Sequence, residues 1–181
     1  MPARTRPRAA TKALPDYLRP GLDIVFVGIN PGLESARRGH HYAGPTNHFW
    51  PLLFEAGFVP ERFTYEDDAR CPDFGIGLTN LVDRPSRGID DLSREEQRAG
   101  AAKLREKLHR YKPRAICFNG KAIFEVFAGR RCALGLQPER LDSALVFVMP
   151  STSARTASYQ RADKLRFFHE LKRLVDKEAS L

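Results

Sequence analysis

Asn30 is a candidate for chemistry in the loop GINPGLESARRGHHY, which runs from Gly28 to Tyr42 directly after a short apolar segment. Pro31 biases Asn30 away from the helical region and so holds its amide in one place. Such a turn can also present backbone N–H groups to an anion. The loop carries neither of the common glycine-rich phosphate-binding patterns. An ordinary turn-forming role for Asn30 is the alternative interpretation.

Three further loops carry polar residues with no evident folding role, and each follows a strand-like run of the sequence. These loops contain Asn80, Lys121 and the hydroxyl-rich segment 151–155. In open parallel sheets, the working residues lie beyond the carboxyl ends of the strands. We therefore expect the four loops to meet at one edge of a sheet.

The elements that must position these loops alternate between strand and helix patterns. Short runs rich in β-branched residues predict buried strands over 23–28, 75–82, 114–119 and 144–149. Apolar stripes and end signals predict helices over 46–57, from the S-x-x-E capping box at Ser93 onward, over 120–127, and along the C-terminal stripe from Leu165 to Val175.

Strands that alternate with helices pair in parallel through right-handed crossovers. The sequence therefore predicts an α/β fold, a three-layer αβα sandwich around a central, mainly parallel sheet of four to five strands. One folded domain is expected over 21–178, preceded by a basic, disordered arm over 1–20. No apolar run approaches the roughly 20 residues that a membrane helix requires.

The composition of the 181 residues, 42% hydrophobic and 29% charged, is that of a globular protein. The net charge is +8, and residues 1–12 contribute four cations and no acid, which leaves +4 on the remainder. This balance favours a polyanionic partner without specifying one. Three scattered cysteines with no CxxC pair argue against disulfides and iron–sulfur clusters. They suit a cytoplasmic setting, at the nucleoid or in the nucleus of a eukaryote.

Five motifs follow one another along the chain: GINPGL, GHHYAGPTNHFW, GLTNLVDRPS, NGKAIFEVF and MPSTSAR. Together they resemble the mismatch-specific uracil/thymine-DNA glycosylase family, within the uracil-DNA glycosylase superfamily, from about residue 23 to near residue 172. The resemblance implies a monofunctional DNA repair enzyme that hydrolyses the N-glycosidic bond of uracil, or of a related damaged pyrimidine, especially opposite guanine. Because the target base cannot be reached inside the duplex, the base must be flipped out.

The resemblance also implies roles for individual side chains. Asn30 would be the catalytic residue, which orients a water molecule toward the sugar while the bond to the base is already breaking. Tyr42 would stack on the flipped base, and Asn80 would bind the edge of the pyrimidine. The other base-pocket residues that the resemblance implies are Ile29, Gly32, Ser35 and His41.

The resemblance places a wedge in the MPSTSAR loop, where Ala154 and Arg155 would fill the gap that the flipped base leaves in the stack. Phosphate contacts are expected from Ser151, Thr152, Ser153 and Lys121. Ser35 stands where the thymine-acting branch has alanine, which puts strong thymine activity in doubt. Asp83 is expected to pair with a neighbouring arginine or, as an alternative, to bind water.

The expected partner is double-stranded DNA with a mismatched or damaged base, bound by a monomer that requires no membrane and no cofactor. No metal site is expected, because His40, His41 and His48 lack a thiol or carboxylate at ligand spacing. Two alternatives stay open. One is a catalytically weak, lesion-binding module of the same fold, and the other is a small α/β nucleoside hydrolase.

Overall fold

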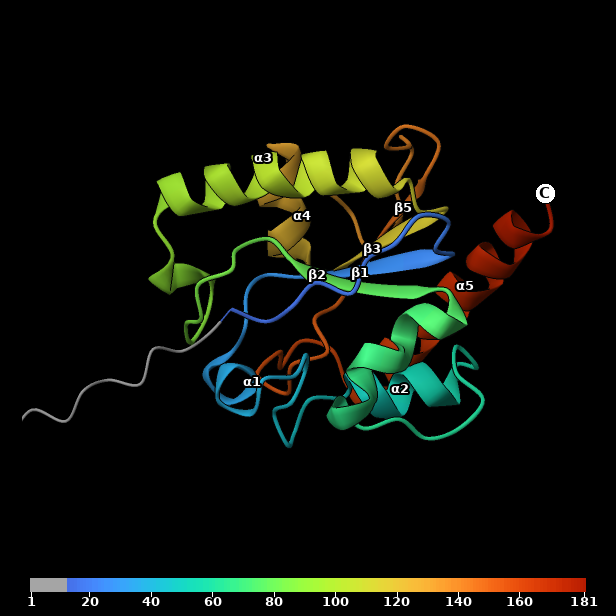
Figure 1. The fold of residues 1–181 in the computed structure, drawn as a ribbon, viewed down its shortest axis with the longest axis horizontal. Coiled ribbons are helices and arrows are strands. Elements are labelled where there is room, and N and C mark those ends of the chain that lie inside the picture. Colours follow the sequence, from blue (N-terminus) through green and yellow to red (C-terminus); the bar gives the residue numbers. More distant parts are fainter. Residues whose placement is uncertain (1–12) are drawn as a thin grey trace, which may run out of the picture.

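A five-stranded sheet lies at the centre of the computed structural model, which describes residues 13–181 (Figure 1). The strands are β1 (Ile24–Gly28), β2 (Ile76–Asn80), β3 (Ala115–Asn119), β4 (Gly135–Leu136) and β5 (Leu145–Met149). Their order is β2-β1-β3-β5-β4, and every pair is parallel except β4 with β5. The predicted α/β fold with its mainly parallel sheet is confirmed.

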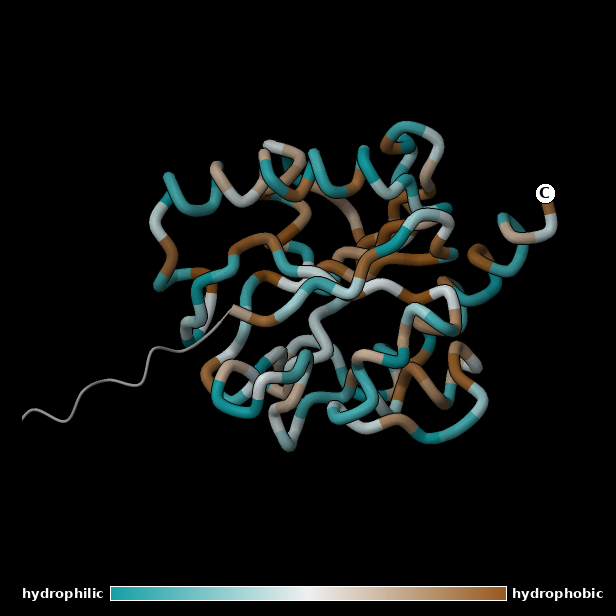
Figure 2. Tube along the Cα trace, in the orientation of Figure 1, coloured by the Kyte–Doolittle hydropathy of each residue, from teal (hydrophilic) through white to brown (hydrophobic). Residues whose placement is uncertain are grey.

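Helices cover both faces of the sheet. One face carries α3 (Arg94–Tyr111) and α4 (Lys121–Ala128), and the other carries α2 (Phe49–Glu55), α5 (Arg161–Ala179) and the 3₁₀ segment η1 (Tyr65–Phe74). Successive strand residues point to opposite faces, so Val25 packs in the core beneath α3 and Phe26 packs near Phe168 of α5. Figure 2 accordingly shows hydrophobic colouring along the sheet and hydrophilic colouring on the outer side of α3.

The ends of the predicted helices follow local hydrogen bonds. The capping box before α3 is present, because Ser93 Oγ accepts from the N–H of Glu96 while the Glu96 carboxylate accepts from the N–H of Ser93. The helix predicted over 46–57 is shorter, since the N–H of Asn47 donates to Gly44 O in a turn and α2 begins only at Phe49. Three short elements, α1 (Leu33–Arg38), η2 (Ile89–Asp91) and β4, lie in segments for which the sequence predicted no helix or strand.

Residues 13–20 pack against the folded body, so the predicted arm boundary at residue 20 is too late. The N–H of Tyr17 donates to Leu78 O at 2.9 Å, and the N–H of Leu78 donates back at 3.0 Å. Leu14 is buried, and Asp16 accepts from the Thr79 hydroxyl. The first twelve residues of the predicted arm lie outside the described residues. No helix within 13–181 is long and apolar enough to cross a membrane.

Gly100 lets α3 approach the chain just beyond β2, because a Cβ at this position would lie 2.2 Å from Leu81 O. Gly100→Ala should therefore destabilise the fold by about 1–3 kcal/mol through overpacking. The sign is opposite to the gain of about 1 kcal/mol that helix propensity alone would give. Urea unfolding measures the difference. Gly44→Ala, where the added methyl meets nothing within 4 Å, is the control. An unchanged or higher midpoint for Gly100→Ala would contradict this interpretation of the packing.

Candidate active site

A cavity of about 710 Å³ opens at the carboxyl ends of the parallel strands. Because β1 lies between β2 and β3, the chain leaves β1 toward one side of the sheet and later returns on the other, which opens a crevice there. Residues from the loops after β1, β2, β3 and β5 all line the cavity. The expectation that these four loops meet is confirmed. The volume is typical of small-molecule sites.

The Asn30 amide is held by the loop that follows β2. Its Nδ2 donates to Arg84 O and to Ser86 Oγ, both at 2.7 Å, and the Ser86 hydroxyl donates to Gly88 O at 2.8 Å. A carbonyl oxygen only accepts, so the Arg84 contact fixes which end of the amide is the nitrogen. Asn30 is 9% exposed and lines the cavity, and its Oδ1 has no hydrogen-bond partner among residues 13–181.

Sequence reasoning did not single out Ser86. Ser86 could have been found from its place in GLTNLVDRPS, because it follows shortly after the end of β2, where parallel-sheet proteins carry ligand-binding residues. Asp83 is exposed, and no ion pair joins it to another side chain in the described part of the chain. The expected pairing with a neighbouring arginine is therefore wrong: Arg84 pairs with Glu96 instead.

Tyr42 forms an aromatic wall of the cavity. Its ring stacks on Phe49 with centroids 4.0 Å apart, and Phe49 is itself fixed by an edge-on contact with Phe26. The Tyr42 hydroxyl is buried and has no hydrogen-bond partner within residues 13–181, and burial raises the pKa of Tyr42. The nearby amide of Asn119 opposes this shift, but it is directed to Thr152. Tyr42 is therefore a neutral, rigid surface at ordinary pH.

Asn80 places an uncommitted amide beside this wall. Asn80 lines the cavity, and its side chain has no hydrogen bond to another residue within 13–181. The preceding β1 strand ends in Gly28, where a Cβ would lie 2.5 Å from Asn80 Oδ1 and 3.3 Å from the Tyr42 hydroxyl. The absence of a side chain at Gly28 thus makes room for both groups. Asn80 offers a donor and an acceptor to a ligand.

Ser35 and His41 line the cavity, but both also fix the loop that carries Tyr42. Ser35 Oγ accepts from the N–H of Ala43 at 3.0 Å, and its hydroxyl hydrogen stays free to donate. His41 Nε2 lies 2.7 Å from Pro15 O, where it acts as the donor. His41 was expected only as a residue of the base pocket; it lines the cavity, but its Nε2 is committed to Pro15 O and anchors the N-terminal segment. Two further predicted pocket residues, Ile29 and Gly32, contribute to the lining.

The buried His41 imidazole makes folding stability depend on pH. Burial lowers the pKa of His41 below its usual 6.5. Below pH 6.5 the unfolded chain therefore binds a proton that the folded chain resists, so stability falls as the pH is lowered. His41→Gln keeps a donor for Pro15 O but does not titrate, and it should reduce the loss of Tm between pH 7.5 and 5.5. Burial also lowers the pKa of His48, so part of the loss persists. An unchanged loss of Tm would refute this assignment to His41.

The loop after β5 consists of a buried strut, Thr152, and an exposed tip, Ala154 and Arg155. Thr152 is only 1% exposed, its N–H donates to Asn119 Oδ1, and its Oγ1 accepts from Asn119 Nδ2, both at 2.9 Å. The expectation that Thr152 contacts phosphate is therefore corrected, because the residue is buried and both its N–H and its Oγ1 are bonded to Asn119. Ala154 and Arg155 are exposed, and Ser151 and Ser153 are half-buried beside them. Arg155 Nη1 reaches across to Arg87 O at 3.0 Å.

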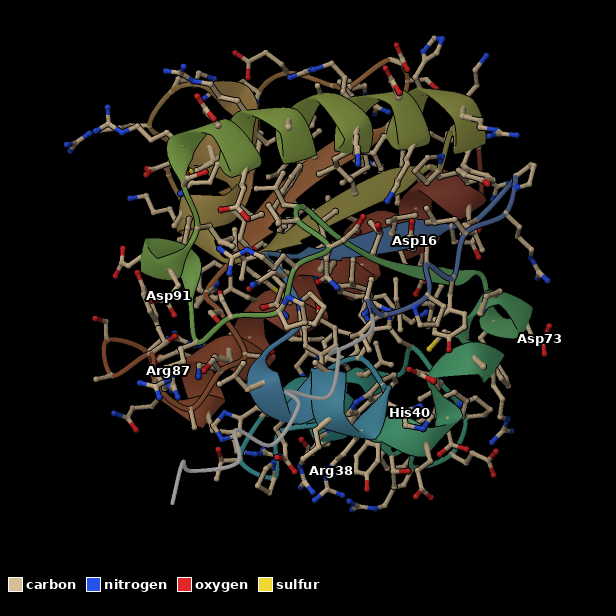
Figure 3. All side chains as sticks on the ribbon, turned by 60° about the vertical axis from the view of Figure 1, so that its left-hand side comes forward. Asp16, Arg38, His40, Asp73, Arg87 and Asp91 are labelled. Carbon is tan, nitrogen blue, oxygen red and sulfur yellow. The ribbon has the colours of Figure 1, made fainter. Side chains whose placement is uncertain are left out.

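The charges around the cavity are almost all positive. Glu34 is the only carboxylate among the described lining residues, and its hydrogen bonds to Arg37 and Arg38 lower its pKa to about 2. By contrast, the lining cations Arg87, Lys121 and Arg155 form no ion pair with any described carboxylate. Arg87 is held through its backbone, whose N–H donates to Asp91 Oδ2 at 3.1 Å. Figure 3 labels Arg87 and Asp91, which lie on the same side of the molecule. The rim of the cavity is thus free to attract an anionic ligand.

Comparisons with known proteins place the fold and the family of this chain. A solution NMR structure from Methanosarcina acetivorans, of a protein provisionally described as a uracil DNA glycosylase, superposes with a TM-score of 0.58. The match covers 92% of this chain and 98% of the other at 21% identity, and it shows a shared fold. The chain belongs to the uracil DNA glycosylase superfamily, whose family model matches residues 15–173. It is thereby a DNA glycosylase, a hydrolase of DNA repair whose substrate is DNA.

Proposed function

We propose that this protein is a monofunctional, mismatch-specific glycosylase of the uracil/thymine type, which removes uracil and related damaged pyrimidines opposite guanine. The observation that carries the proposal is the Asn30 amide, with its nitrogen tied to Arg84 O and Ser86 Oγ and its oxygen unbonded. Such an oxygen can accept a hydrogen bond from water and hold that water in one position. In this proposal the water lies below the sugar of the flipped nucleotide.

The base pocket is proposed to use the two groups beside Asn30. The flipped pyrimidine stacks on Tyr42, whose other side is supported by Phe49, and such stacking contributes about 1–3 kcal/mol. The Asn80 amide binds the donor and acceptor groups at the edge of the base. Ser35, where the thymine-acting branch has alanine, places a hydroxyl in the cavity lining and favours uracil over thymine in this proposal.

The chemistry is proposed to proceed with bond breaking ahead of attack. The electron pair of the N-glycosidic bond leaves with the base, and the water oxygen then bonds to the anomeric carbon and loses a proton to solvent. Among the described lining residues Glu34 is the only carboxylate, and it is already paired with two arginines, so we assign it no role as general base. Backbone N–H groups around Ile29 and of Gly32 to Ser35, residues that line the cavity, are proposed to stabilise the developing negative charge on the base. Because no carboxylate assists the attack, we expect slow turnover and a dependence on bases that are good leaving groups.

DNA binding is proposed to use Arg87, Lys121 and Arg155, the lining cations that pair with no carboxylate in the described part of the chain. The protein is proposed to act as a monomer on cytoplasmic or nuclear DNA. Lys121→Ala should weaken binding to any duplex and reduce the slope of log affinity against log salt by about one. Fluorescence anisotropy at several salt concentrations measures this slope. Lys103→Ala, an exposed lysine of α3 outside the cavity lining, is the control. Equal slopes for the two variants would remove Lys121 from the proposed interface.

A single-turnover assay tests the proposed function and its two alternatives together. The substrates are one duplex carrying a G·U pair, the same duplex with A·U, and free deoxyuridine. We expect alkali-labile abasic sites from both duplexes, faster from G·U, and no release of uracil from the nucleoside. Tight binding of the G·U duplex without cleavage would instead identify a lesion-binding module. Hydrolysis of free deoxyuridine at the duplex rate would identify a nucleoside hydrolase.

A further inference from the structure

Lys164 is a buried cation beneath the loop that follows β5. It lies in α5, at the end of the first helical turn, and the residue is only 1% exposed. Its ammonium donates to Ser153 O at 3.0 Å. No carboxylate of residues 13–181 lies within ion-pair distance of this ammonium. Lys164 therefore directs its charge at the carbonyl of Ser153, the residue that precedes the candidate wedge residues Ala154 and Arg155.

This arrangement opposes the stability of the folded state. Removal of an ammonium from water is costly unless the charge is paired, and burial lowers the pKa of Lys164. A cation near a helix N-terminus also opposes the helix dipole. The neighbouring groups give no compensation: the Asp163 carboxylate bonds Arg166 and the N–H of Gln160. The Lys164 charge in turn adds to burial in lowering the pKa of His48.

Lys164 binds Ser153, which connects the buried strut at Thr152 to the exposed tip of the loop. Thr152 is bound to β3 through Asn119, and its carbonyl accepts from the N–H of His48 at 3.0 Å. The next carbonyl, that of Ser153, accepts from the Lys164 ammonium at 3.0 Å and from the N–H of Thr156 at 3.2 Å, so Lys164 is its side-chain partner. The Ser153 hydroxyl then accepts from the N–H of Arg155 at 3.3 Å. The orientation of the Ser153 peptide thus sets the direction in which the exposed tip projects.

We propose that Lys164 is a positioning residue for base extrusion, which holds the Ser153 peptide so that Ala154 and Arg155 can enter the duplex. Its charge lies under the loop whose outer side is assigned to phosphate, where a bound phosphate would provide the counter-charge that the free protein lacks. This inference rests on the proposed function. In this proposal the buried charge of Lys164 destabilises the free protein and stabilises the complex with DNA.

The test measures extrusion without cleavage. A duplex carries non-hydrolysable 2′-fluoro-2′-deoxyuridine opposite guanine and 2-aminopurine beside it, so that stopped-flow fluorescence reports base flipping. Lys164→Met should lower the flipping equilibrium by about tenfold or more, as loss of a charge-assisted hydrogen bond implies. Its Tm should be unchanged or higher, because a buried charge is replaced by an apolar chain. Lys164→Arg should recover much of the flipping. Lys177→Met, at an exposed site on the same helix, is the control.

Two results would overturn the proposal. One is flipping by Lys164→Met that equals the wild type. The other is a lowered Tm together with a loss of binding to undamaged duplex, because a merely structural lysine would produce both. The proposed function fails separately, if the wild-type protein flips the analogue but does not cleave an ordinary G·U duplex.

Discussion

Asn30→Ala is expected to lower the single-turnover rate of uracil release from a G·U duplex by about 10²- to 10³-fold. The reason is geometric: without the amide oxygen, no described side chain holds a water molecule at that position, and the lining offers no unpaired carboxylate to replace it. Binding to a duplex that contains an abasic site should change little, because the cations at the rim are untouched. Gel analysis of alkali-treated product gives the rate, and anisotropy gives the affinity.

The matched control separates the water-holding oxygen from the loop contacts of the same side chain. Ser86→Ala removes one of the two hydrogen bonds to Asn30 Nδ2 but leaves the contact to Arg84 O. It should cost only about tenfold in rate, the value of one hydrogen bond. If Asn30→Ala stays within tenfold of the wild type, or if both variants lose rate equally, the proposed role of the Asn30 oxygen is wrong.

Tyr42→Ala is the second change with a large expected effect. It removes the aromatic wall on which the base is proposed to stack, worth about 1–3 kcal/mol, so the rate and the affinity for lesion DNA should each fall about 10- to 100-fold. The variant also exposes Phe49, because in the wild-type protein the Tyr42 ring covers Phe49, with the two ring centroids 4.0 Å apart. Parallel measurements of single-turnover rate and of lesion affinity test both effects.

Tyr42→Phe is the control for this experiment, because it keeps the ring and removes only the hydroxyl. That hydroxyl is buried and bonds no other described residue, and an unsatisfied buried polar group destabilises a fold by about 1–3 kcal/mol. Tyr42→Phe should therefore cleave at nearly the wild-type rate and unfold at a higher temperature. A large loss of activity in Tyr42→Phe would mean that the hydroxyl contacts the substrate, contrary to the stacking role proposed for the ring.

The strands were predictable because their signal is local. A strand buried on both faces needs a continuous apolar run, and DIVFVG, RAICFN and ALVFVM are such runs. The capping box at Ser93 was equally visible, since both partners lie within one helical turn. The elements α1 and β4 were not predicted, because six and two residues are too few to display an apolar period. Their positions follow from packing on neighbouring segments.

The candidate site divides in the same way. The sequence identified Asn30, Tyr42 and Asn80 as residues for the cavity, and the structure brings all three to its lining. It could not show that Thr152 is internal, because Thr152 is fixed by Asn119, which lies 33 residues earlier in the chain. In the same way His41 is bonded to Pro15 O, and Pro15 lies in a segment that was expected to be disordered.

The sequence by itself therefore determined the class of fold, the order of its strands along the chain and the edge of the sheet where the chemistry lies. Each of these depends on residue types within a few positions of one another. The tertiary structure alone decided which atoms of those residues are free. The Asn30 nitrogen is bonded to Ser86, 56 residues away, and Lys164 reaches Ser153 from another element. Such contacts form only when distant segments pack together, and no local pattern encodes them.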